Sequence, residues 1–590
     1  MHESRRAHND DIMSDIYDSP RWKELMGVPT ATLLRIALQL CVDGVPSFKR
    51  KELFSIKPVQ YLILSLAPEL RYQACNMLVQ MLLPAHLKGL HAKKYYDFVA
   101  ADEMNDLHRQ GVDGVRVVLY GVTLDTPGRR ELLSLQSVQA FYPCGHCLHT
   151  WQSGTRRLVY GGYRRFLPLD SRWRSKQFEY RGNVYYFRDE EHRPPPALRT
   201  DDSAVVMTSL ATTSEPFCGH KAVPCFLNRW IGHSYSGHVC DIMHDKKLMC
   251  EMLLKNMVGK LKTGMYSGWN YDEKHRLDCQ IYGMFPEFAS GAQKLPPWRL
   301  DRAALSVVDE RIKSMWWPHY MDKLCKKKHS FFTHSDRMYK CSHKNYIVMV
   351  ILPVVLRGFV SALHNAILMV VHALRRLAGQ VPCQDEAERL GVTPGARVLH
   401  KCDIAALKEE LLFGLVLLEG CLPIAKLNPA LHHFVHYGRY GSTHGLFLRD
   451  LSMVVFERYN KYMKGLVRDV SHPEANLANS VTQDAAAHFS TLSDFKFDIA
   501  TAPHHTCVLS SKSKKDYVPS ANVLADLRMM NVAVDCFSCC PYDIAHIMGV
   551  HFRAGEWGKS PRCGSVITCV LELDGNRRSV YGRVEVFLTN

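Results

Sequence analysis

The 590-residue sequence has no apolar stretch that is long enough and free enough of charge to cross a membrane. A transmembrane helix needs roughly 20 such residues, but the most apolar segment, 346–374, is broken by Pro353 and Arg357. We expect this segment to form a buried helical pair. The opening residues show no charged-then-apolar leader, and the 20 cysteines lack the regular spacing of a secreted disulfide scaffold. Both absences favour an intracellular, reducing setting and no membrane partner.

The sequence also lacks fixed-period repeats, low-complexity tracts and a Walker motif. The nearest match to a phosphate-binding loop is Gly558-Lys559-Ser560, but Arg553 stands where the motif requires its first glycine. Positive charge is abundant, because 74 Lys and Arg residues exceed 58 Asp and Glu residues by 16. A basic protein of this size favours a polyanionic partner, with nucleic acid as the first candidate. A basic protein without such a partner is the alternative.

Two acidic residues come at the end of apolar runs that alternate like β-strands. Asp43 ends the run 33–43, and Asp125 follows the run 115–124. Carboxylates at the carboxyl ends of neighbouring strands can converge on one site. Two Mg²⁺ ions, about 3.5–4 Å apart, need such oxygen ligands to flank a scissile phosphate. The two acids therefore predict a two-magnesium nuclease site.

A third acid, Glu457, lies on an amphipathic helix that we predict over 448–467. Apolar side chains line one face of this helix and basic side chains line another, with Glu457 near the border. We expect the helix to lean against the sheet, so that Glu457 joins the other two acids. The alternative is an exposed ion pair between Glu457 and Lys461, one helical turn away.

The elements expected around the first two acids follow the order β-β-β-α-β-α. We predict strands over 33–43, 47–55 and 60–66, a helical stretch over 71–109, a strand over 115–124 and a helix over 128–137. With acids after the first and fourth strands, this order is similar to the ribonuclease-H-like core of nucleases and DNA recombinases. We therefore predict an α/β fold in which a ribonuclease-H-like core is interrupted by a large, mostly helical insertion.

The chain is expected to divide into five regions. These are an N-terminal arm over 1–30, the first part of the core over 31–141, the insertion over 142–400, returning core helices with the third acid over 401–480, and a β-rich C-terminal region over 481–590. Helical periodicity over 405–420 marks the return to the core. In the last region, a turn at 574–576 between two apolar runs predicts a hairpin.

A second set of candidate metal ligands consists of thiols and imidazoles. Cys144 and Cys147 form a C-x₂-C knuckle, and His432 and His436 are four residues apart, which places them on one face of a helix. Together they predict a tetrahedral zinc site that clamps the start of the insertion to the returning core. Plain burial of all four is the alternative. Three neighbouring histidines leave the choice of ligands open: His146, His149 and His433.

Two weaker patterns carry less specific predictions. Asp241 and His244 are three residues apart and can share a helix face, which makes them a possible accessory pair, although many surface pairs do the same. Near the end of the chain, Cys536, Cys539 and Cys540 are predicted to be buried rather than to bind metal.

Two stretches within the expected insertion, 154–188 and 323–344, concentrate basic side chains. The first interleaves arginines with aromatic residues. Arginines can neutralise phosphates while aromatic rings stack on unpaired bases, so we predict DNA contact; a solvated charged face is the alternative. The residues expected to contact DNA are Arg156, Arg157, Arg164, Arg165, Arg172, Trp173, Arg174, Lys326, Lys327, Lys328, Lys461 and Lys464.

Ten short motifs occur in a fixed order along most of the chain. They are DIYD at 15–18, VDGVP at 42–46, DTPGR at 125–129, CGHCLH at 144–149, RRFLPLD at 164–170, DIMH at 241–244, LPVVLRG at 352–358, HHFVH at 432–436, FERYNKYMKGLVR at 456–468 and YGRVEVFL at 581–588. In this order, they resemble motifs of the CACTA (En/Spm-like) DNA transposases. The segment just before Glu457 departs from the family pattern, so Asp450 and Glu474 are alternatives for the third acid.

The resemblance implies a cut-and-paste DNA transposase with a DDE triad and an inserted, zinc-bound helical domain. Asp43, Asp125 and Glu457 would hold two Mg²⁺; water would cut at the transposon ends, and the freed 3′-hydroxyl would then attack target DNA. Because two ends must be brought together, we expect a homo-oligomer, and DNA as partner implies a nuclear location. The alternative is a catalytically inactive, transposase-derived DNA-binding or chromatin-associated protein.

Overall fold

The computed structural model describes a large part of the chain. The described residues are 11–27, 34–46, 55–84, 87, 90–150, 152–153, 158–159, 161–187, 193–225, 230–231, 234–258, 272–315, 339–380, 384–389, 397–423, 427–445, 451–467, 475–483, 508–509, 544–547, 550–553, 566–573 and 576–583. By their contacts, they fall into one unit over 1–72 and 77–464 and a second over 73–76 and 465–590. Within these ranges, no helix combines the length and apolar character needed to span a bilayer.

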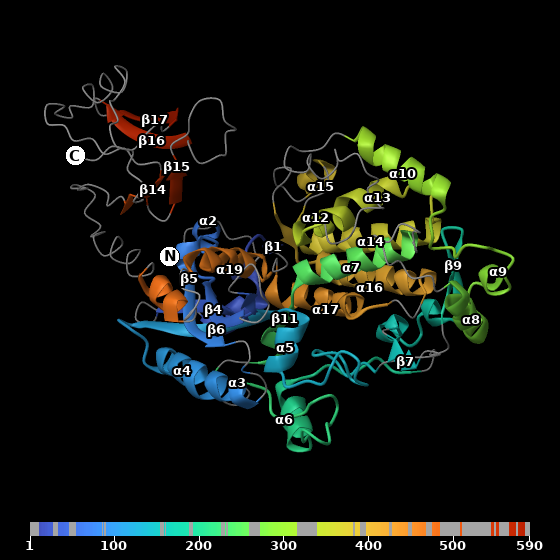
Figure 1. Ribbon diagram of the computed structural model, residues 1–590, viewed down its shortest axis with the longest axis horizontal. Coiled ribbons are helices and arrows are strands. Elements are labelled where there is room, and N and C mark those ends of the chain that lie inside the picture. Colours follow the sequence, from blue (N-terminus) through green and yellow to red (C-terminus); the bar gives the residue numbers. More distant parts are fainter. Residues whose placement is uncertain are drawn as a thin grey trace. The chain divides into compact units, whose positions relative to one another are not determined.

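A mixed sheet lies at the centre of the first unit (Figure 1). Its strands are ordered β11 (His238–Cys240), β6 (Val115–Leu124), β2 (Leu34–Val42), β4 (Ser55–Ile63) and β5 (Met77–Pro84), with the short β3 (Val45–Pro46) also on β4. Strands β11, β6 and β2 run parallel, whereas β4 is antiparallel to both β2 and β5. The carboxyl ends of three adjacent strands therefore meet at one edge.

The sheet agrees with the sequence-based expectation at two strands and differs at others. Strands β2 and β6 begin and end within one residue of the predicted bounds. The helical stretch predicted over 71–109 is wrong in its first part, because β5 pairs with β4 there. Methionine and leucine are good helix formers, but sheet pairing overrides such local preferences. Strand β11 returns to the sheet from within the segment that we expected to be inserted.

Helices cover both faces of the sheet. On one face, α3 (Leu90–Tyr95), the π-helical segment Tyr96–Ala100 and α4 (Ala101–Arg109) bury apolar residues against Leu40 and Val122. The opposite face meets α1 (Pro20–Met26), whose Arg21 Nε donates to the Tyr120 carbonyl at 2.6 Å. Helices α17 (Pro429–His444) and α19 (Val454–Leu466) also meet this face. The core thus has a helix–sheet–helix layering, and the acids follow its parallel strands.

Beside the sheet, four long helices pack in sequence. Helix α14 (Ser361–Leu377) contacts α16 (Asp403–Cys421), α16 contacts α17, and α17 contacts α7 (Ile242–Val258) (Figure 1). Gly414 permits the close approach of α16 to α14, because a Cβ there would lie 2.8 Å from Val370 Cγ2. The helix predicted over 405–420 is confirmed as α16. Helices α12 (Cys341–Tyr346) and α13 (Leu352–Val355), with α14, confirm the buried helical character of 346–374.

Shorter elements complete the first unit around this frame. They are β1 (Ile12–Met13), α2 (Pro68–Arg71), α5 (Thr126–Leu132), β7 (Gln152–Ser153), β8 (Leu158–Val159), β9 (Gln177–Tyr180), β10 (Asn183–Tyr186), α6 (Asp201–Ser209), α8 (Asp272–Tyr282), α9 (Pro286–Ala289), α10 (Arg302–Ser314), α15 (Gln384–Arg389) and β12 (Leu399–His400). The helix predicted over 128–137 corresponds to α5, which begins two residues earlier and ends five residues sooner.

The second unit is described through short strands. Strands β13 (Val508–Leu509), β14 (Ile544–Ile547) and β15 (Val550–Arg553) form an antiparallel sheet. Strands β16 (Val566–Leu573) and β17 (Asn576–Arg583) pair so that Leu573 lies opposite Asn576. This pairing confirms the hairpin that the turn at 574–576 predicts. The cysteines at 536, 539 and 540, and the alternative acids at 450 and 474, lie outside the described residues.

Candidate functional site

An acidic residue follows each of the three adjacent parallel strands. Leu40 of β2 pairs with Val122 of β6, so Asp43 and Asp125 come three residues later on neighbouring strands. Cys240 of β11 pairs with Leu124, which places Asp241 beside Asp125 at the same edge. From the sequence, Asp241 is predicted only as part of an accessory pair with His244. Strand β11 has three residues, which is too short to show a periodic pattern that would place Asp241 at this edge.

Asp43 and Asp125 lie on the same face of the sheet. The Gln39 side chain donates to Thr123 Oγ1 at 2.5 Å, so these two side chains share a face. Residues an even number further along a strand return to that face, which applies to Asp43 on one strand and Asp125 on the other. Burial first, and then the negative charges of Asp125 and Glu457, raise the pKa of Asp43 to about 6. The three predicted acids therefore share one electrostatic environment.

Helix α19 is fixed against this face through Asn460. Its side-chain amide donates to Asp43 Oδ2 at 3.3 Å, and its Oδ1 accepts from Gln60 of β4 at 2.6 Å. Glu457 lies three residues earlier, on the same face of the helix. The structure thus brings the third predicted acid to the edge that carries Asp43 and Asp125. Its side chain keeps 42% of its surface exposed, as an open ligand requires.

Asp241 is already saturated with hydrogen bonds. Its Oδ1 accepts from Met243 N at 3.2 Å, Ser452 Oγ at 3.1 Å and Met453 N at 3.0 Å, and its Oδ2 accepts from His244 N at 3.1 Å. The backbone N–H of Glu457 in turn donates to the Met453 carbonyl at 2.8 Å. A buried carboxylate so engaged has little capacity left for a metal ion. Asp241 therefore acts to position the first turn of α19 and, with it, Glu457.

His244 connects Asp241 to Glu457. Its Nδ1 lies 2.5 Å from Asp241 Oδ2, and its Nε2 lies 3.3 Å from Glu457 Oε1. Burial lowers the pKa of His244, but the hydrogen bonds and charges of the two carboxylates outweigh this effect and raise it to about 10. At neutral pH, His244 is therefore an imidazolium that donates from both nitrogens. Its positive charge offsets part of the negative charge gathered at this edge.

Replacing Asp43 with Asn should raise the melting temperature of the magnesium-free protein at pH 7.5 but not at pH 4. The folded protein raises the pKa of Asp43 from 3.8 to about 6. The folded state then holds the proton more tightly than the unfolded state, so stability falls as pH rises from about 4 to about 6. Asparagine removes this cost, about 1–2 kcal/mol for a partly solvated carboxylate. Thermal melts at both pH values measure the change in melting temperature, and Asp106→Asn, at an exposed position, is the control. An equal change at both pH values would contradict the raised pKa of Asp43.

The second candidate centre is a buried cluster of two thiols and two imidazoles. Ligand atoms of Cys144, Cys147, His432 and His436 lie within 4.8 Å of one another. Sγ of Cys144 is 3.3 Å from Nε2 of His436, and Sγ of Cys147 is 3.3 Å from Nε2 of His432. A tetrahedral site with Zn–S near 2.3 Å and Zn–N near 2.0–2.1 Å has S···N edges of about 3.5 Å. The cluster therefore has the donors and the spacing to bind a metal ion.

Local structure explains why these four side chains converge. Asn428 caps α17 by accepting from Leu431 N at 3.1 Å, and the helix then presents His432 and His436 on one face. The Arg199 guanidinium holds the knuckle by donating from Nε to the Cys144 carbonyl at 3.0 Å. Burial raises the pKa of Cys144, but the hydrogen bond with Cys147 and the nearby His432 and His436 hold it well below its ordinary value. A thiolate is the form that binds metal.

The three histidines that left the ligand choice open contact other groups. His149 Nε2 lies 2.7 Å from the Gly161 carbonyl, His146 Nε2 lies 3.2 Å from Cys240 Sγ, and His433 Nδ1 lies 2.9 Å from Asp245 Oδ1. In the described part of the chain, the four-ligand cluster is the one formed by Cys144, Cys147, His432 and His436. The geometry thus selects the set that the spacing suggested.

The residues expected to contact DNA are placed unevenly. Arg164, Arg165 and Arg174 are buried. Arg164 donates to the Ser175 carbonyl at 2.6 Å, and Arg174 donates to the Leu167 carbonyl at 2.9 Å. These guanidinium groups satisfy loop carbonyls inside the fold, which differs from the expected phosphate contacts.

Other predicted DNA contacts remain at the surface. Arg172 is exposed and lies 4.1 Å over the ring of Trp173, and Lys461 and Lys464 are exposed on α19. The remaining predicted contacts, at 156–157 and 326–328, lie outside the described residues. Of the described residues expected to contact DNA, Lys461 and Lys464 are thus exposed on the helix that carries Glu457.

A comparison with models of protein families found no match to this chain, and a comparison with curated proteins found none either. Two features of the structure therefore indicate function: acids gathered at the carboxyl edge of a mixed sheet, and a buried Cys/His cluster whose two cysteines follow α5 in the chain.

Proposed function

We propose that this chain is a DDE-type DNA transposase that cleaves and joins DNA strands with two Mg²⁺ held by Asp43, Asp125 and Glu457. The observation that carries the proposal is the arrangement of these acids. Two follow adjacent parallel strands in register, and the third comes from a helix that hydrogen-bonds to the first acid through Asn460. A site of this kind matches the motif resemblance that the sequence shows to CACTA transposases.

The sheet supports a ribonuclease-H-like core. Leaving out the two-residue β3, the strands in chain order are β2, β4, β5, β6 and β11, and only β4 is antiparallel to the others. The acids follow the first and fourth of these strands, as the resemblance implies. Strand β11 adds a third adjacent parallel strand to the sheet before the chain enters α7. The proposed insertion is therefore divided into two segments, one before β11 and one after it.

The acidic site suits magnesium. Bound Mg²⁺ would activate the attacking oxygen and stabilise the leaving oxygen of a phosphodiester. The residues present fit this ion, because carboxylate oxygens are its preferred protein ligands. Burial first, and then the charges of Asp125 and Glu457, raise the pKa of Asp43, and a bound cation would offset both costs. Asn460 orients Asp43, the Gly128 N–H orients Asp125 at 2.7 Å, and His244 orients Glu457.

The remaining assignments follow from the same proposal. Zinc is the metal that best fits the Cys₂His₂ cluster, where it would join the loop after α5 to α17. The substrates are transposon ends and target DNA, and the exposed Lys461 and Lys464 lie on the same helix as Glu457, where they can hold phosphates. Joining two ends requires at least two copies of the chain, and the substrate requires a nuclear location.

Purified full-length protein should convert supercoiled plasmid DNA to nicked and linear forms in Mg²⁺ or Mn²⁺, but not in buffer without divalent ions. The reaction needs two metal ions at the acids, so activity should rise steeply with metal concentration. Gel separation of the plasmid forms measures it, and Lys461→Gln with Lys464→Gln provides a DNA-binding control. Protein that binds the plasmid but cuts it in neither metal would favour the inactive, transposase-derived DNA-binding protein.

A further inference from the structure

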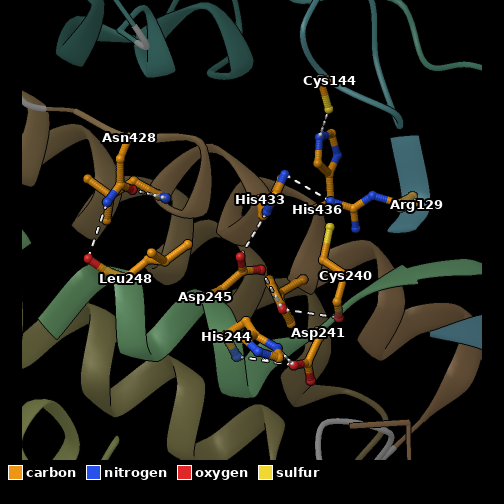
Figure 2. Close-up of polar contacts among 12 residues, drawn as sticks. Arg129, Cys144, Cys240, Asp241, His244, Asp245, Leu248, Asn428, His433 and His436 are labelled. Atoms are coloured by element: carbon orange, nitrogen blue, oxygen red, sulfur yellow. Dashed lines mark hydrogen bonds and ion pairs between the residues drawn. The ribbon is translucent and has the colours of Figure 1, made fainter. Parts of the chain in front are cut away.

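A buried polar network lies between the acidic site and the Cys/His cluster. Ligand-type atoms of Cys240, Asp245 and His433 lie within 4.8 Å of one another. A guanidinium nitrogen of Arg129 lies 3.0 Å from His433 Nε2, and Asp245 Oδ1 lies 2.9 Å from His433 Nδ1 (Figure 2). The Arg129 guanidinium faces one imidazole nitrogen of His433, and the Asp245 carboxylate faces the other. His433 therefore bridges two side chains here, and these residues do not form a cation site.

Arg129 and Asp245, the two ends of this bridge, each come one helical turn after an acid along the chain. Arg129 N donates to the Asp125 carbonyl at 3.0 Å, and Asp245 N donates to the Asp241 carbonyl at 3.0 Å. Arg129 is on α5, which Asp125 caps, and Asp245 is on α7, which follows Asp241 directly. The bridge from Arg129 to Asp245 through His433 therefore fixes the distance between α5, which follows Asp125, and α7, which follows Asp241.

The third element of the bridge is α17, which carries His433 between the two imidazole ligands of the Cys/His cluster. Tyr437, one turn further on α17, reinforces the contact by donating to Asp245 Oδ2 at 2.9 Å. The knuckle is joined to α17 through the cluster, and α17 is joined to both acid-bearing helices through His433. Figure 2 shows His433 directed between Arg129 and Asp245, with Cys144 near His436 beyond it.

We propose that His433 is a positioning residue that couples the Cys/His metal centre to the acidic site. This inference rests on the proposed function of the acids as metal ligands. Arg129 can only donate, so His433 accepts at Nε2 and donates its single proton from Nδ1 to Asp245. One imidazole thus aligns α5 with α7, and a metal ion bound by the cluster would hold this imidazole in place by fixing α17.

Binding of Mn²⁺ to the full-length protein tests the coupling without relying on catalysis. His433→Leu keeps similar bulk but removes both hydrogen bonds, so Mn²⁺ affinity measured by electron paramagnetic resonance should fall about 10-fold, as for other groups that orient metal ligands. Zinc content should stay at one ion per chain, because the four zinc ligands are intact. The control is His364→Leu, on α14. It removes a buried histidine whose Nε2 lies 2.7 Å from the Pro353 carbonyl, and it should leave Mn²⁺ affinity unchanged.

Two partial replacements keep the test decisive if His433→Leu fails to fold. His433→Asn retains a donor toward Asp245, and His433→Gln retains an acceptor toward Arg129, so each should lower Mn²⁺ affinity by a smaller factor. Wild-type Mn²⁺ affinity in these variants, with zinc retained, would overturn the coupling while leaving the proposed function intact. Wild-type protein that binds no Mn²⁺ would instead overturn the proposed function and the coupling with it.

Discussion

Replacing Glu457 with Gln should reduce magnesium-dependent nicking about 1000-fold, because losing several kcal/mol of metal-mediated transition-state stabilisation lowers the rate by this factor. Glutamine preserves the shape of the side chain and its contact with His244 but removes the charge that a metal ion needs. Asp43→Asn should have an effect of the same size. Initial nicking rates at saturating DNA measure both losses, and DNA affinity should remain at the wild-type value.

The lysines of the same helix supply the matched control. Lys461→Gln with Lys464→Gln leaves the carboxylates intact and removes two exposed positive charges. This double variant should keep Mn²⁺ affinity but weaken DNA binding, with a salt-dependence slope shallower by about 2. Wild-type nicking by Glu457→Gln would show that another acid serves as the third ligand. Loss of DNA binding in that variant would show that Glu457 supports the fold rather than the chemistry.

The position of α19 makes this test informative. The sequence left open a simple ion pair between Glu457 and Lys461 on the helix surface. In the structure, the Glu457 carboxylate instead lies 3.3 Å from His244 Nε2, and Asn460 reaches Asp43 one turn further along. An exposed ion pair would contribute only about 0.3–0.5 kcal/mol. The contact of Glu457 with a charged histidine, and the contact of Asn460 on the same helix face with Asp43, give Glu457 a site-facing role that such a pair lacks.

Local periodicity made the first half of the acidic site predictable. Strands β2 and β6 are long and apolar, so their ends, and the acids that follow them, could be placed from the alternating pattern. The structure has the expected order of elements, but its second and third long strands are not the predicted ones. The run predicted as the second strand, 47–55, lies outside the described residues except for Ser55, which begins β4. The run predicted as the third strand, 60–66, belongs mostly to β4, and the third long strand is β5.

The features that sequence patterns did not predict depend on contacts between distant parts of the chain. Strand β11 has three residues, and only its register against β6 shows that Asp241 belongs to the acidic edge. The same limit applies to Arg164 and Arg174, whose sequence context suits DNA contact but whose side chains bind loop carbonyls. Charge and spacing do not reveal which partner a guanidinium finds, because that partner comes from the tertiary fold.

The Cys/His cluster was only partly predictable from the sequence. Spacing identified a pair of cysteines and a pair of histidines, but it could not show that the two pairs lie together in the fold. Cys144 and Cys147 follow the sheet's fourth long strand, and α17 arrives almost three hundred residues later. Their ligand atoms converge because α17 packs on α7 and bonds to α5 through His433. The pairing of knuckle and helix is therefore a property of the helical packing.

Replacing Cys144 with Ala should remove the zinc ion and destabilise the first unit by about 4 kcal/mol or more, because loss of a structural metal belongs to the most damaging class of substitutions. The remaining three ligands would leave a buried thiol and two imidazoles without the cation that joins them. Zinc content by atomic spectroscopy should fall from one ion per chain to none. The urea midpoint of the helical signal should fall with it.

A buried cysteine outside the cluster separates metal loss from simple cavity formation. Cys250→Ala, on α7, removes a side chain as buried as that of Cys144 but leaves all four ligands in place. It should retain its zinc and lose only about 1 kcal/mol, the usual cost of a single substitution. If the wild-type protein carries no zinc, or if Cys144→Ala and Cys250→Ala lower the urea midpoint equally, the cluster is a packing feature of the helices. Mn²⁺ binding at the acids separates the two variants further. If Cys144→Ala weakens it and Cys250→Ala does not, metal bound by the cluster stabilises the alignment of α5 and α7 through α17.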